Sequence, residues 1–309
     1  MTYRTLSDLS NLVRLNIFKI PHDIDLVVGI PRSGMLPANM IALFLNKKLT
    51  DIDSFIEGRV FCSGERSKYI TNAEIQKVLV VDDSVHSGKA MLGAKEKLKN
   101  VAIQYELLYL APIVTTWGKQ YVDIFFEVID DIRIFEWNLF HHSILENSCV
   151  DIDGVINLDP VQDDDGPIYK SFLQNAMPLF TPTVKIGALV SCRLEKYRKE
   201  TDCWLKRNNI RYNHLEMLPF SSKEERVTWG KHGKYKGEFY RNHDYSLFLE
   251  SDSYQAQIIA DIAQKPVICI ESNKLVLPYT HVSFKKRCKR SIKKKFPSFY
   301  RLVKQLLQS

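Results

Sequence analysis

Two segments of the chain place a short apolar run directly before a polar loop and a helical pattern. In residues 23–48 (DIDLVVGIPRSGMLPANMIALFLNKK) the apolar run ends at Gly29, and apolar residues recur with helical spacing after Pro37. Residues 77–100 (KVLVVDDSVHSGKAMLGAKEKLKN) repeat this order, and further apolar runs follow at 105–114 and 122–129. Strands that alternate with helices predict an α/β domain whose parallel sheet is covered on both faces. Ligands bind such sheets at the carboxyl ends of the strands, where both polar loops lie.

A second alternation of strands and helices begins near residue 148. It runs through SCVDIDGVINLD, VKIGALVSCRLEKYRKETDCWLKRNNI, SLFLESDSYQAQIIADIAQ and KPVICIES. The intervening IFEWNLFHHSILENS contains no Pro-rich or Gly-rich linker, so we expect two packed domains rather than two tethered ones. The predicted boundaries are residues 1–147 for the first domain, 148–283 for the second and 284–309 for a tail.

Composition is that of a globular protein that stays in the cytoplasm. The 309 residues are 45% hydrophobic and 26% charged. No apolar run approaches the ~20 residues that span a bilayer, and the N-terminal residues lack the pattern of a signal peptide. The six cysteines show no Cys-x-x-Cys spacing, so we expect neither a disulfide framework nor a zinc site.

The formal net charge of +7 is concentrated in the tail. Residues 285–309 hold ten Lys or Arg and no acid, which leaves the rest of the chain with 33 bases and 36 acids. Apolar residues near helical spacing follow the basic cluster, so the tail resembles a basic amphipathic segment suited to anionic lipid. A solvated charge run is the alternative of comparable weight, and nucleic acid is a third possible partner.

The loop that follows the apolar run VLVV carries two adjacent acids, Asp82 and Asp83. Hydroxyls, a glycine and the start of a helix come next, and backbone N–H groups in such a loop suit a phosphate. The acids would then accept hydrogen bonds from sugar hydroxyls or approach a metal. Each residue alone would be interpreted as a helix cap, but two acids and a Ser-Gly loop on one strand end favour a ligand site.

These two loops resemble those of the type I phosphoribosyltransferases. VVDDSVHSGKA is similar to the loop with which that family binds phosphoribosyl pyrophosphate (PRPP), and VVGIPRSGMLPA is similar to its pyrophosphate loop. The resemblance implies that Asp82 and Asp83 bind the ribose hydroxyls. It further implies a 5-phosphate site and a pyrophosphate site with magnesium. The residues implied are Ser84, Ser87, Gly88, Lys89 and Ala90 for the 5-phosphate, and Arg32, Ser33 and Gly34 for the pyrophosphate.

The loop departs from the family pattern at three positions. Lys89 and Ala90 stand where a small residue and a hydroxyl are usual, which puts one phosphate contact in doubt. His86 stands where members that salvage nucleobases often carry an aspartate. A histidine there could deprotonate a hydroxyl acceptor, or it could simply hydrogen-bond within the loop.

A second pair of acids, Asp151 and Asp153, ends the apolar run in CVDIDGVINLD. This pattern resembles the first motif of haloacid-dehalogenase-type phosphatases. The resemblance implies that Asp151 attacks phosphorus, that Asp153 acts as general acid and base, and that Mg²⁺ is the cofactor. Later strands are similar to the remaining motifs. They imply Ser191 and Lys236 as phosphate-binding residues, with Lys236 preferred to Lys231 and Lys234, and Asp151, Asp153, Glu250 and Asp252 as metal ligands.

The two resemblances together predict two Rossmann-like α/β domains, a phosphoribosyltransferase-type parallel sheet and a haloacid-dehalogenase-type domain with a small cap. Such a pair is similar to the two-domain ribofuranosyltransferases of bacterial surface polysaccharide synthesis. Our main hypothesis is therefore a two-step β-ribofuranosyl transfer. A hydroxyl of a lipid-linked glycan receives phosphoribose from PRPP, and the second domain hydrolyses the 5-phosphate. The tail would hold the enzyme at the inner face of the membrane.

Two alternatives remain open. The first joins a nucleobase phosphoribosyltransferase to a nucleotidase, although making and then destroying a nucleotide in one protein is wasteful. The second is a regulator that senses PRPP and binds nucleic acid through the tail. The four phosphatase-like motifs disfavour the regulator, since it needs no working phosphatase. We therefore expect PRPP and a glycan, rather than nucleic acid, as partners.

Overall fold

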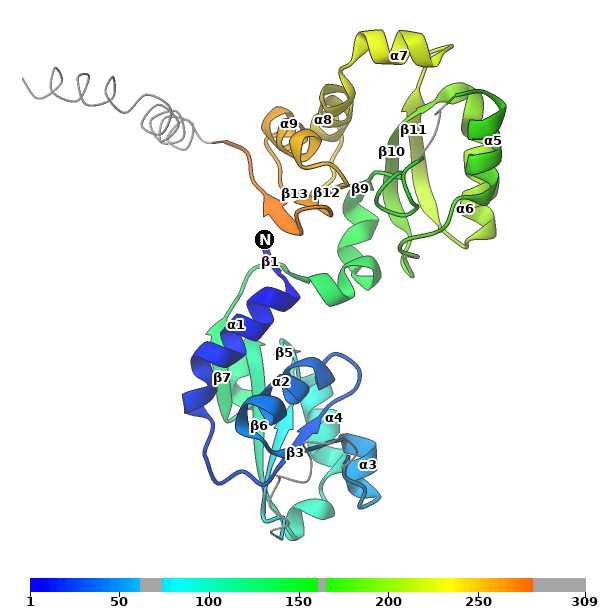
Figure 1. Cartoon of the computed structure of the whole chain (residues 1–309). Coiled ribbons are helices and arrows are strands. Elements are labelled where there is room, and N and C mark those ends of the chain that lie inside the picture. Colours follow the sequence, from blue (N-terminus) through cyan, green and yellow to red (C-terminus); the bar gives the residue numbers. More distant parts are fainter. Residues whose placement is uncertain (62–73, 161–164, 280–309) are drawn as a thin grey trace, which may run out of the picture. The chain divides into compact units, whose positions relative to one another are not determined.

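The computed structural model describes residues 1–61, 74–160 and 165–279, so the predicted tail at 284–309 lies outside the described residues. The chain divides into two compact units, Met1–Leu139 and Phe140–Ser309 (Figure 1). This division comes before the boundary that we predicted after Asn147. The reason is that the short helical segment η6 (Ser143–Asn147) packs against β9, β10 and β12 of the second unit.

The first unit is built on a parallel sheet with the strand order β3-β2-β4-β6-β5, and β7 also pairs with β6. All of its strand pairs are parallel, which confirms the α/β prediction for this part of the chain. The strands are β2 (Leu26–Gly29), β3 (Lys48–Asp51), β4 (Lys77–Val81), β5 (Ser84–Val85), β6 (Glu106–Val114) and β7 (Ile124–Val128).

Helices cover both faces of this sheet because side chains alternate between the faces along each strand. Val27 and Leu79 face a core formed with α1 (Leu6–Asn16) and α2 (Met35–Leu45). Their neighbours Val28 and Val80 face a second core, to which α3 (Ile52–Ile56) and α4 (Lys89–Lys97) contribute. The continuous apolar runs in the sequence thus correspond to strands that are buried on both faces.

A separate two-stranded sheet joins the start of the chain to the end of the first unit. Strand β1 (Thr2–Arg4) pairs in parallel with β8 (Arg133–Phe135), and Thr2 is opposite Arg133. The chain then turns into α1 through a capping box, in which the Thr5 and Asp8 side chains each bond to the backbone of the other residue. After β8 the chain continues into η5 (Glu136–His141).

The second unit contains a sheet with the strand order β11-β10-β9-β12-β13-β14, in which only the pair β13 and β14 is antiparallel among the described strands. Helices α8 (His232–Asn242) and α9 (Ser253–Ala263) pack on one face, around Tyr240, Phe248 and Ile259. The strands are β9 (Ser148–Val150), β10 (Ile186–Leu194), β11 (Tyr212–Leu218), β12 (Leu247–Glu250), β13 (Val267–Cys269) and β14 (Lys274–Val276).

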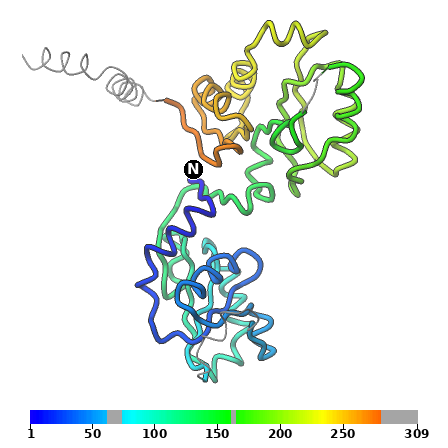
Figure 2. Tube along the Cα trace, in the orientation of Figure 1, coloured from blue at the N-terminus to red at the C-terminus, as the bar shows by residue number. Residues whose placement is uncertain are grey.

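Two insertions interrupt the alternation of strands and helices in the second unit. Helix α5 (Gly166–Asn175) lies between β9 and β10, and α7 (Lys223–Trp229) lies with α8 between β11 and β12. Helix α5 packs against α6 (Arg198–Arg207), and the described parts of both insertions can be followed along the Cα trace in Figure 2. The haloacid-dehalogenase-type assignment and its small cap stay predictions.

Within the described ranges, no helix is long and apolar enough to cross a membrane. The four cysteines described there, Cys149, Cys192, Cys203 and Cys269, are free.

We predict that Leu79→Ala destabilises the protein by about 2–5 kcal/mol, because it removes a fully buried side chain and leaves a cavity between β4 and the helices above it. Leu43→Ala is the matched control, since Leu43 is 74% exposed on α2 and its truncation should change the free energy of unfolding by no more than about 0.5 kcal/mol. Urea unfolding of the two variants provides the measurement. Equal effects would contradict the assignment of the core.

Candidate functional site

The two predicted loops of the first unit start side by side at the edge of the sheet. Gly29 at the end of β2 is opposite Val81 at the end of β4, and the Ile30 N–H donates to the Val81 carbonyl at 2.9 Å. Loop 30–34 and loop 82–88 therefore leave neighbouring strands in the same direction.

Gly34 allows these two loops to approach closely. A Cβ atom at this position would lie 2.5 Å from the Ile30 carbonyl oxygen, 2.8 Å from the Val81 carbonyl oxygen and 3.0 Å from the Asp82 Cα. Backbone atoms on three sides leave no room for a side chain. The glycine of the predicted pyrophosphate loop thus fixes its distance from the aspartate pair.

The loop after Asp83 turns at Gly88 into the N-terminus of α4. Gly88 has a φ of 76°, and a Cβ atom there would lie 2.4 Å from the ring of Tyr121. Only glycine combines this backbone conformation with such a close aromatic neighbour. The turn exposes N–H groups at the start of α4, which is an arrangement that favours anions.

A cavity of about 200 Å³ lies over this loop. It brings together Asp82, every residue from Ser84 to Met91, and Arg133 from β8. His86, Ser87, Lys89 and Ala90 are exposed at its surface. Asp83 and the predicted pyrophosphate residues Arg32, Ser33 and Gly34 are not among the described residues that line it.

The two aspartates are both 6% exposed, but they have different surroundings. Burial, together with the neighbouring Asp83, raises the pKa of Asp82 to about 7. The Asp83 carboxylate accepts a hydrogen bond of 2.8 Å from the indole N–H of Trp137. The ring of Trp137 also stacks on Phe135, so this residue connects one of the two acids to an aromatic pair.

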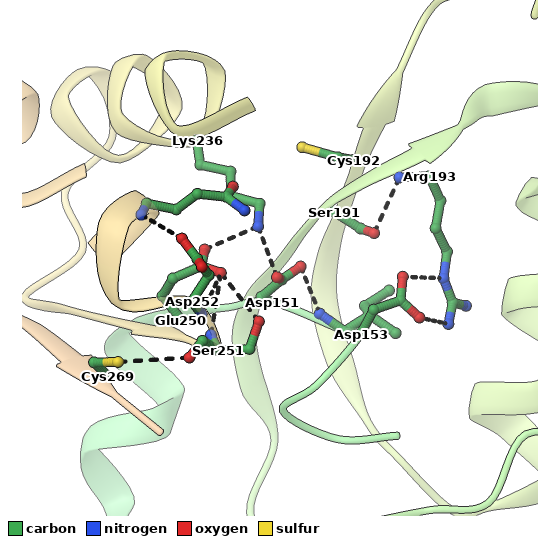
Figure 3. A network of polar contacts seen from close by, with 12 residues as sticks. Asp151, Asp153, Ser191, Cys192, Arg193, Lys236, Glu250, Ser251, Asp252 and Cys269 are labelled. Atoms are coloured by element: carbon green, nitrogen blue, oxygen red, sulfur yellow. Dashed lines mark hydrogen bonds and ion pairs between the residues drawn. The ribbon is translucent and has the colours of Figure 1, made fainter. Parts of the chain in front are cut away.

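In the second unit, a buried lysine joins the acids at the ends of β9 and β12. These strands are paired with Val150 opposite Leu249, so the next residues, Asp151 and Glu250, are neighbours. Lys236 of α8 lies between them, with Nζ 2.6 Å from Asp151 Oδ2 and 2.8 Å from Glu250 Oε2 (Figure 3). Lys234 instead pairs with Glu238 on the surface of α8.

The Lys236 cluster holds two carboxylates and one ammonium in a buried position. Burial would lower the pKa of Lys236, but Asp151 and Glu250 raise it well above its usual value, so the ammonium stays charged. Burial raises the pKa of Asp151, and Lys236 opposes that change. The cluster has an excess of negative charge that a further cation would relieve.

Asp153 is held by a different base, Arg193 of β10. The guanidinium donates from Nε at 2.9 Å and from Nη2 at 2.6 Å, and Asn157 donates to the same carboxylate at 3.1 Å. Arg193 is 2% exposed and also contacts Thr201. Burial would raise the pKa of Asp153, but Arg193 and Asn157 lower it, so this carboxyl group is ionised.

The other two residues predicted for this site have local structural contacts. The Ser191 hydroxyl is buried and accepts a hydrogen bond from the Arg193 N–H. Asp252 is exposed and caps α9, because its carboxylate accepts from the Gln255 N–H at 2.7 Å. Figure 3 shows both residues near the Lys236 cluster.

A cavity of about 190 Å³ opens beside Asp151, Asp153 and Lys236. Ser191, Glu250 and Asp252 are not among the described residues that line it. The lining adds residues that we did not predict, and the charged or aromatic ones are Asp159, Tyr169, Arg193, Arg226 and His232. Three acids and several bases thus face the same small space, which suits a bound phosphate with a cation.

One carboxylate connects the two insertions that border this cavity. Asp165, the N-cap of α5, accepts hydrogen bonds from the Tyr197 hydroxyl and from the N–H of Lys223 at the start of α7. It also pairs with the Lys196 ammonium. These donors lower the pKa of Asp165, although burial opposes them.

The four predicted metal ligands do not converge. Among the residues that the structure describes, no three His, Cys, Asp or Glu side chains form a group that could hold a metal ion. Lys236 lies between Asp151 and Glu250, and Arg193 forms an ion pair with Asp153. Asp252 caps helix α9. Mg²⁺ commonly binds through one or two carboxylates with water and substrate phosphate, so the excess negative charge beside Asp151 still fits it.

The comparisons with known proteins concern the N-terminal part of the chain. Residues 9–143 match a family model described as "Phosphoribosyl transferase domain". The matched residues make up most of the first unit, which is therefore similar to a phosphoribosyltransferase domain. Such a domain implies binding of PRPP. No curated protein matches the chain.

Solved structures of phosphoribosyltransferases resemble the chain. A purine phosphoribosyltransferase from Pyrococcus horikoshii is 19% identical, with a TM-score of 0.32 over 44% of this chain and 92% of its own. A xanthine-guanine-hypoxanthine phosphoribosyltransferase from Helicobacter pylori is 15% identical, with a TM-score of 0.34 over 44% of this chain and 91% of its own. An orotate phosphoribosyltransferase from Aeropyrum pernix is 19% identical, with a TM-score of 0.29 over 40% of this chain and 70% of its own.

We predict that Gly34→Ala weakens PRPP binding at least about tenfold, because its methyl group would push the loops of the phosphoribosyltransferase domain apart at Asp82. Gly93→Ala is the matched control, since a Cβ atom there meets nothing within 4 Å and alanine favours the helix. Calorimetric titration with PRPP and Mg²⁺ measures both affinities. Unchanged binding by Gly34→Ala would show that the close approach is dispensable.

We also predict that Asp82→Asn stabilises the protein at neutral pH. The native pKa of about 7 lies above the ordinary 3.8, so the native state binds more protons than the unfolded state between these values. Wild-type stability should therefore fall as the pH rises from about 4 to 7, and Asp82→Asn should remove that fall, by on the order of a few kcal/mol. Urea unfolding at pH 4, 6 and 8 tests this, with the exposed Asp244→Asn as control. Parallel stability curves for wild type and Asp82→Asn would refute it.

Proposed function

We propose that the chain transfers phosphoribose from PRPP to a hydroxyl of a glycan and then removes the 5-phosphate. The observation that carries this proposal is the presence of two differently built sites. One is an aspartate pair beside a phosphate-type loop in the phosphoribosyltransferase domain, and the other is the Lys236 cluster beside a small polar cavity. Transfer from PRPP leaves a 5-phosphate on the product, so a phosphatase in the same chain would have a substrate.

The phosphoribosyltransferase domain would hold PRPP across its two loops. N–H groups at the start of α4 suit the 5-phosphate, and Gly88 supplies the left-handed turn from which α4 begins. Asp82 and Asp83 would accept hydrogen bonds from the ribose hydroxyls, with Asp83 oriented by Trp137. Loop 30–34 would hold the pyrophosphate, next to Asp82 because of Gly34.

The transfer step requires a base for the acceptor hydroxyl. His86 is exposed on the lining of the cavity, from which it could take the hydroxyl proton as the acceptor oxygen bonds to the anomeric carbon and pyrophosphate departs. Attack from the face opposite pyrophosphate would convert the α-linked donor into a β-ribofuranosyl product.

The second unit would hydrolyse the 5-phosphate through Asp151. This carboxylate would attack phosphorus as the bond to the ribosyl 5-oxygen breaks and that oxygen takes a proton from water. Lys236 would hold the carboxylate in position and offset the charge of the incoming phosphate. Asp153, kept ionised by Arg193, is suited to accept the proton of the water that hydrolyses the phospho-aspartate. Magnesium, when bound near Asp151, supplies neutralisation of the phosphate charge.

A lipid-linked acceptor would be consistent with the basic tail. The ten bases of residues 285–309 suit attraction to anionic lipid at the inner face of a membrane, at about 1 kcal/mol for each base near the surface. The small cavity of the second unit would admit the phosphoribosyl end of a larger glycan while the remainder stays outside.

We predict that Asp151→Asn leaves pyrophosphate release intact and accumulates 5-phosphorylated product, because it removes the attacking carboxylate of the second unit and leaves the loops of the first unit unchanged. Phosphorus NMR of the purified protein with Mg²⁺ and PRPP, with glycan acceptors or nucleobases added in turn, resolves pyrophosphate, phosphomonoester and inorganic phosphate. Wild type and the exposed control Asp244→Asn should free inorganic phosphate, and Asp151→Asn should reduce its release at least about 1,000-fold.

Two results would count against the proposal. If only nucleobases trigger pyrophosphate release, the glycan acceptor is wrong while the transferase assignment stands. If folded Asp151→Asn frees phosphate at the wild-type rate, the assignment of Asp151 as nucleophile is wrong.

A further inference from the structure

Arg133 reaches the phosphate-type loop from a distant part of the sequence. It is the first residue of β8, in the two-stranded sheet, and β8 begins more than forty residues after the loop. Its side chain nevertheless lines the cavity over that loop, together with Asp82 and the residues from Ser84 to Met91. Nothing in the sequence around Arg133 indicates this contact, because a single arginine near acidic residues is ordinary.

One nitrogen of the Arg133 guanidinium has no hydrogen-bond acceptor among the described residues. Its Nη1 atom is buried and has no hydrogen-bond partner within the described part of the chain. Asp83 and Asp130 attract the guanidinium electrostatically, yet no described carboxylate forms an ion pair with it. A buried donor that carries charge and lacks an acceptor is costly, so such groups commonly mark a place where a ligand binds.

The surroundings indicate which ligand chemistry would complete this site. On the loop side the cavity is formed by residues at the start of α4, where N–H groups and the helix dipole favour an anion. Arg133 adds a positive charge to the lining of the same cavity. A guanidinium and several N–H groups facing one space suit the oxygens of a phosphate, which can accept from all of them at once.

We propose that Arg133 binds the 5-phosphate of the phosphoribosyl donor, opposite the N–H groups of loop 84–90. This assignment rests on the proposed use of PRPP by the first unit, and it requires neither the glycan acceptor nor the phosphatase. The two-stranded sheet would then contribute to the donor site, because its strand β8 carries Arg133.

The test needs a signal that reports on this site alone, since the second unit is also proposed to bind phosphate. The indole N–H of Trp137 provides it, because it donates to Asp83 beside the cavity. Its NMR resonance is identified in tryptophan-labelled full-length protein as the one that Trp137→Phe removes. All titrations use the Asp151→Asn chain, so that ribose 5-phosphate is not hydrolysed.

The Trp137 resonance is followed with ribose 5-phosphate, PRPP and pyrophosphate, each with Mg²⁺, in chains with and without Arg133→Met. We expect Arg133→Met to weaken ribose 5-phosphate and PRPP by roughly 10- to 100-fold and to leave pyrophosphate unchanged. Arg133→Lys should restore part of the affinity, because it keeps the charge but loses the fork of donors. Arg14→Met, which removes an exposed arginine of α1, is the control for net charge and should bind all three ligands as the parent does.

Wild-type affinity of Arg133→Met for ribose 5-phosphate would overturn the proposal. An equal loss for pyrophosphate and ribose 5-phosphate would also overturn it, because that pattern indicates a general disturbance of the domain. Thermal unfolding of each variant separates such a disturbance from the loss of a contact. Failure of glycan transfer in the NMR assay of products would leave this result untouched, so the two proposals can fail independently.

Discussion

Carboxylates gathered at the carboxyl ends of parallel strands repel one another, and both units are organised around the groups that relieve this repulsion. In the second unit a single ammonium, that of Lys236, lies between Asp151 and Glu250, and Arg193 holds Asp153. In the first unit no such base lies between the acids among the described contacts. The Trp137 indole N–H donates to Asp83, and burial together with Asp83 still raises the pKa of Asp82. The first pair is therefore left with capacity to bind hydroxyls or a cation. In the second unit bases already contact the acids, although the Lys236 cluster keeps an excess of negative charge.

Glycines set the distances on which the first site depends. Gly34 brings the loop after β2 against the backbone at Asp82, and Gly88 allows Tyr121 to pack under the turn into α4. Neither residue contributes a functional group. Their effect is to let main-chain atoms occupy space that a side chain would fill, so that loops from different strands meet around one ligand.

The sequence was sufficient for features that are local along the chain. Apolar runs before polar loops predicted the parallel sheet of the first unit. Asp82 and Asp83 were selected as candidate ligand-binding residues because they directly follow one of these runs. Contacts between distant segments were not predictable in the same way. Trp137 meets Asp83 across 54 positions, and Arg193 meets Asp153 across 40, with no pattern in either segment that names the partner. The four acids predicted as metal ligands do not form one group among the described residues, because Lys236 and Arg193 pair with three of them and Asp252 caps α9.

Asp165 is not part of the described lining of the cavity beside Asp151, yet it contacts the starts of two helices that contribute to that lining. It accepts hydrogen bonds at the start of α5 and at the start of α7, and these helices carry Tyr169 and Arg226 into the lining. The starts of α5 and α7 are thus both hydrogen-bonded to the same carboxylate. Asp165 therefore links the starts of the two helices that bring Tyr169 and Arg226 to the cavity, although its own side chain is not part of the described lining.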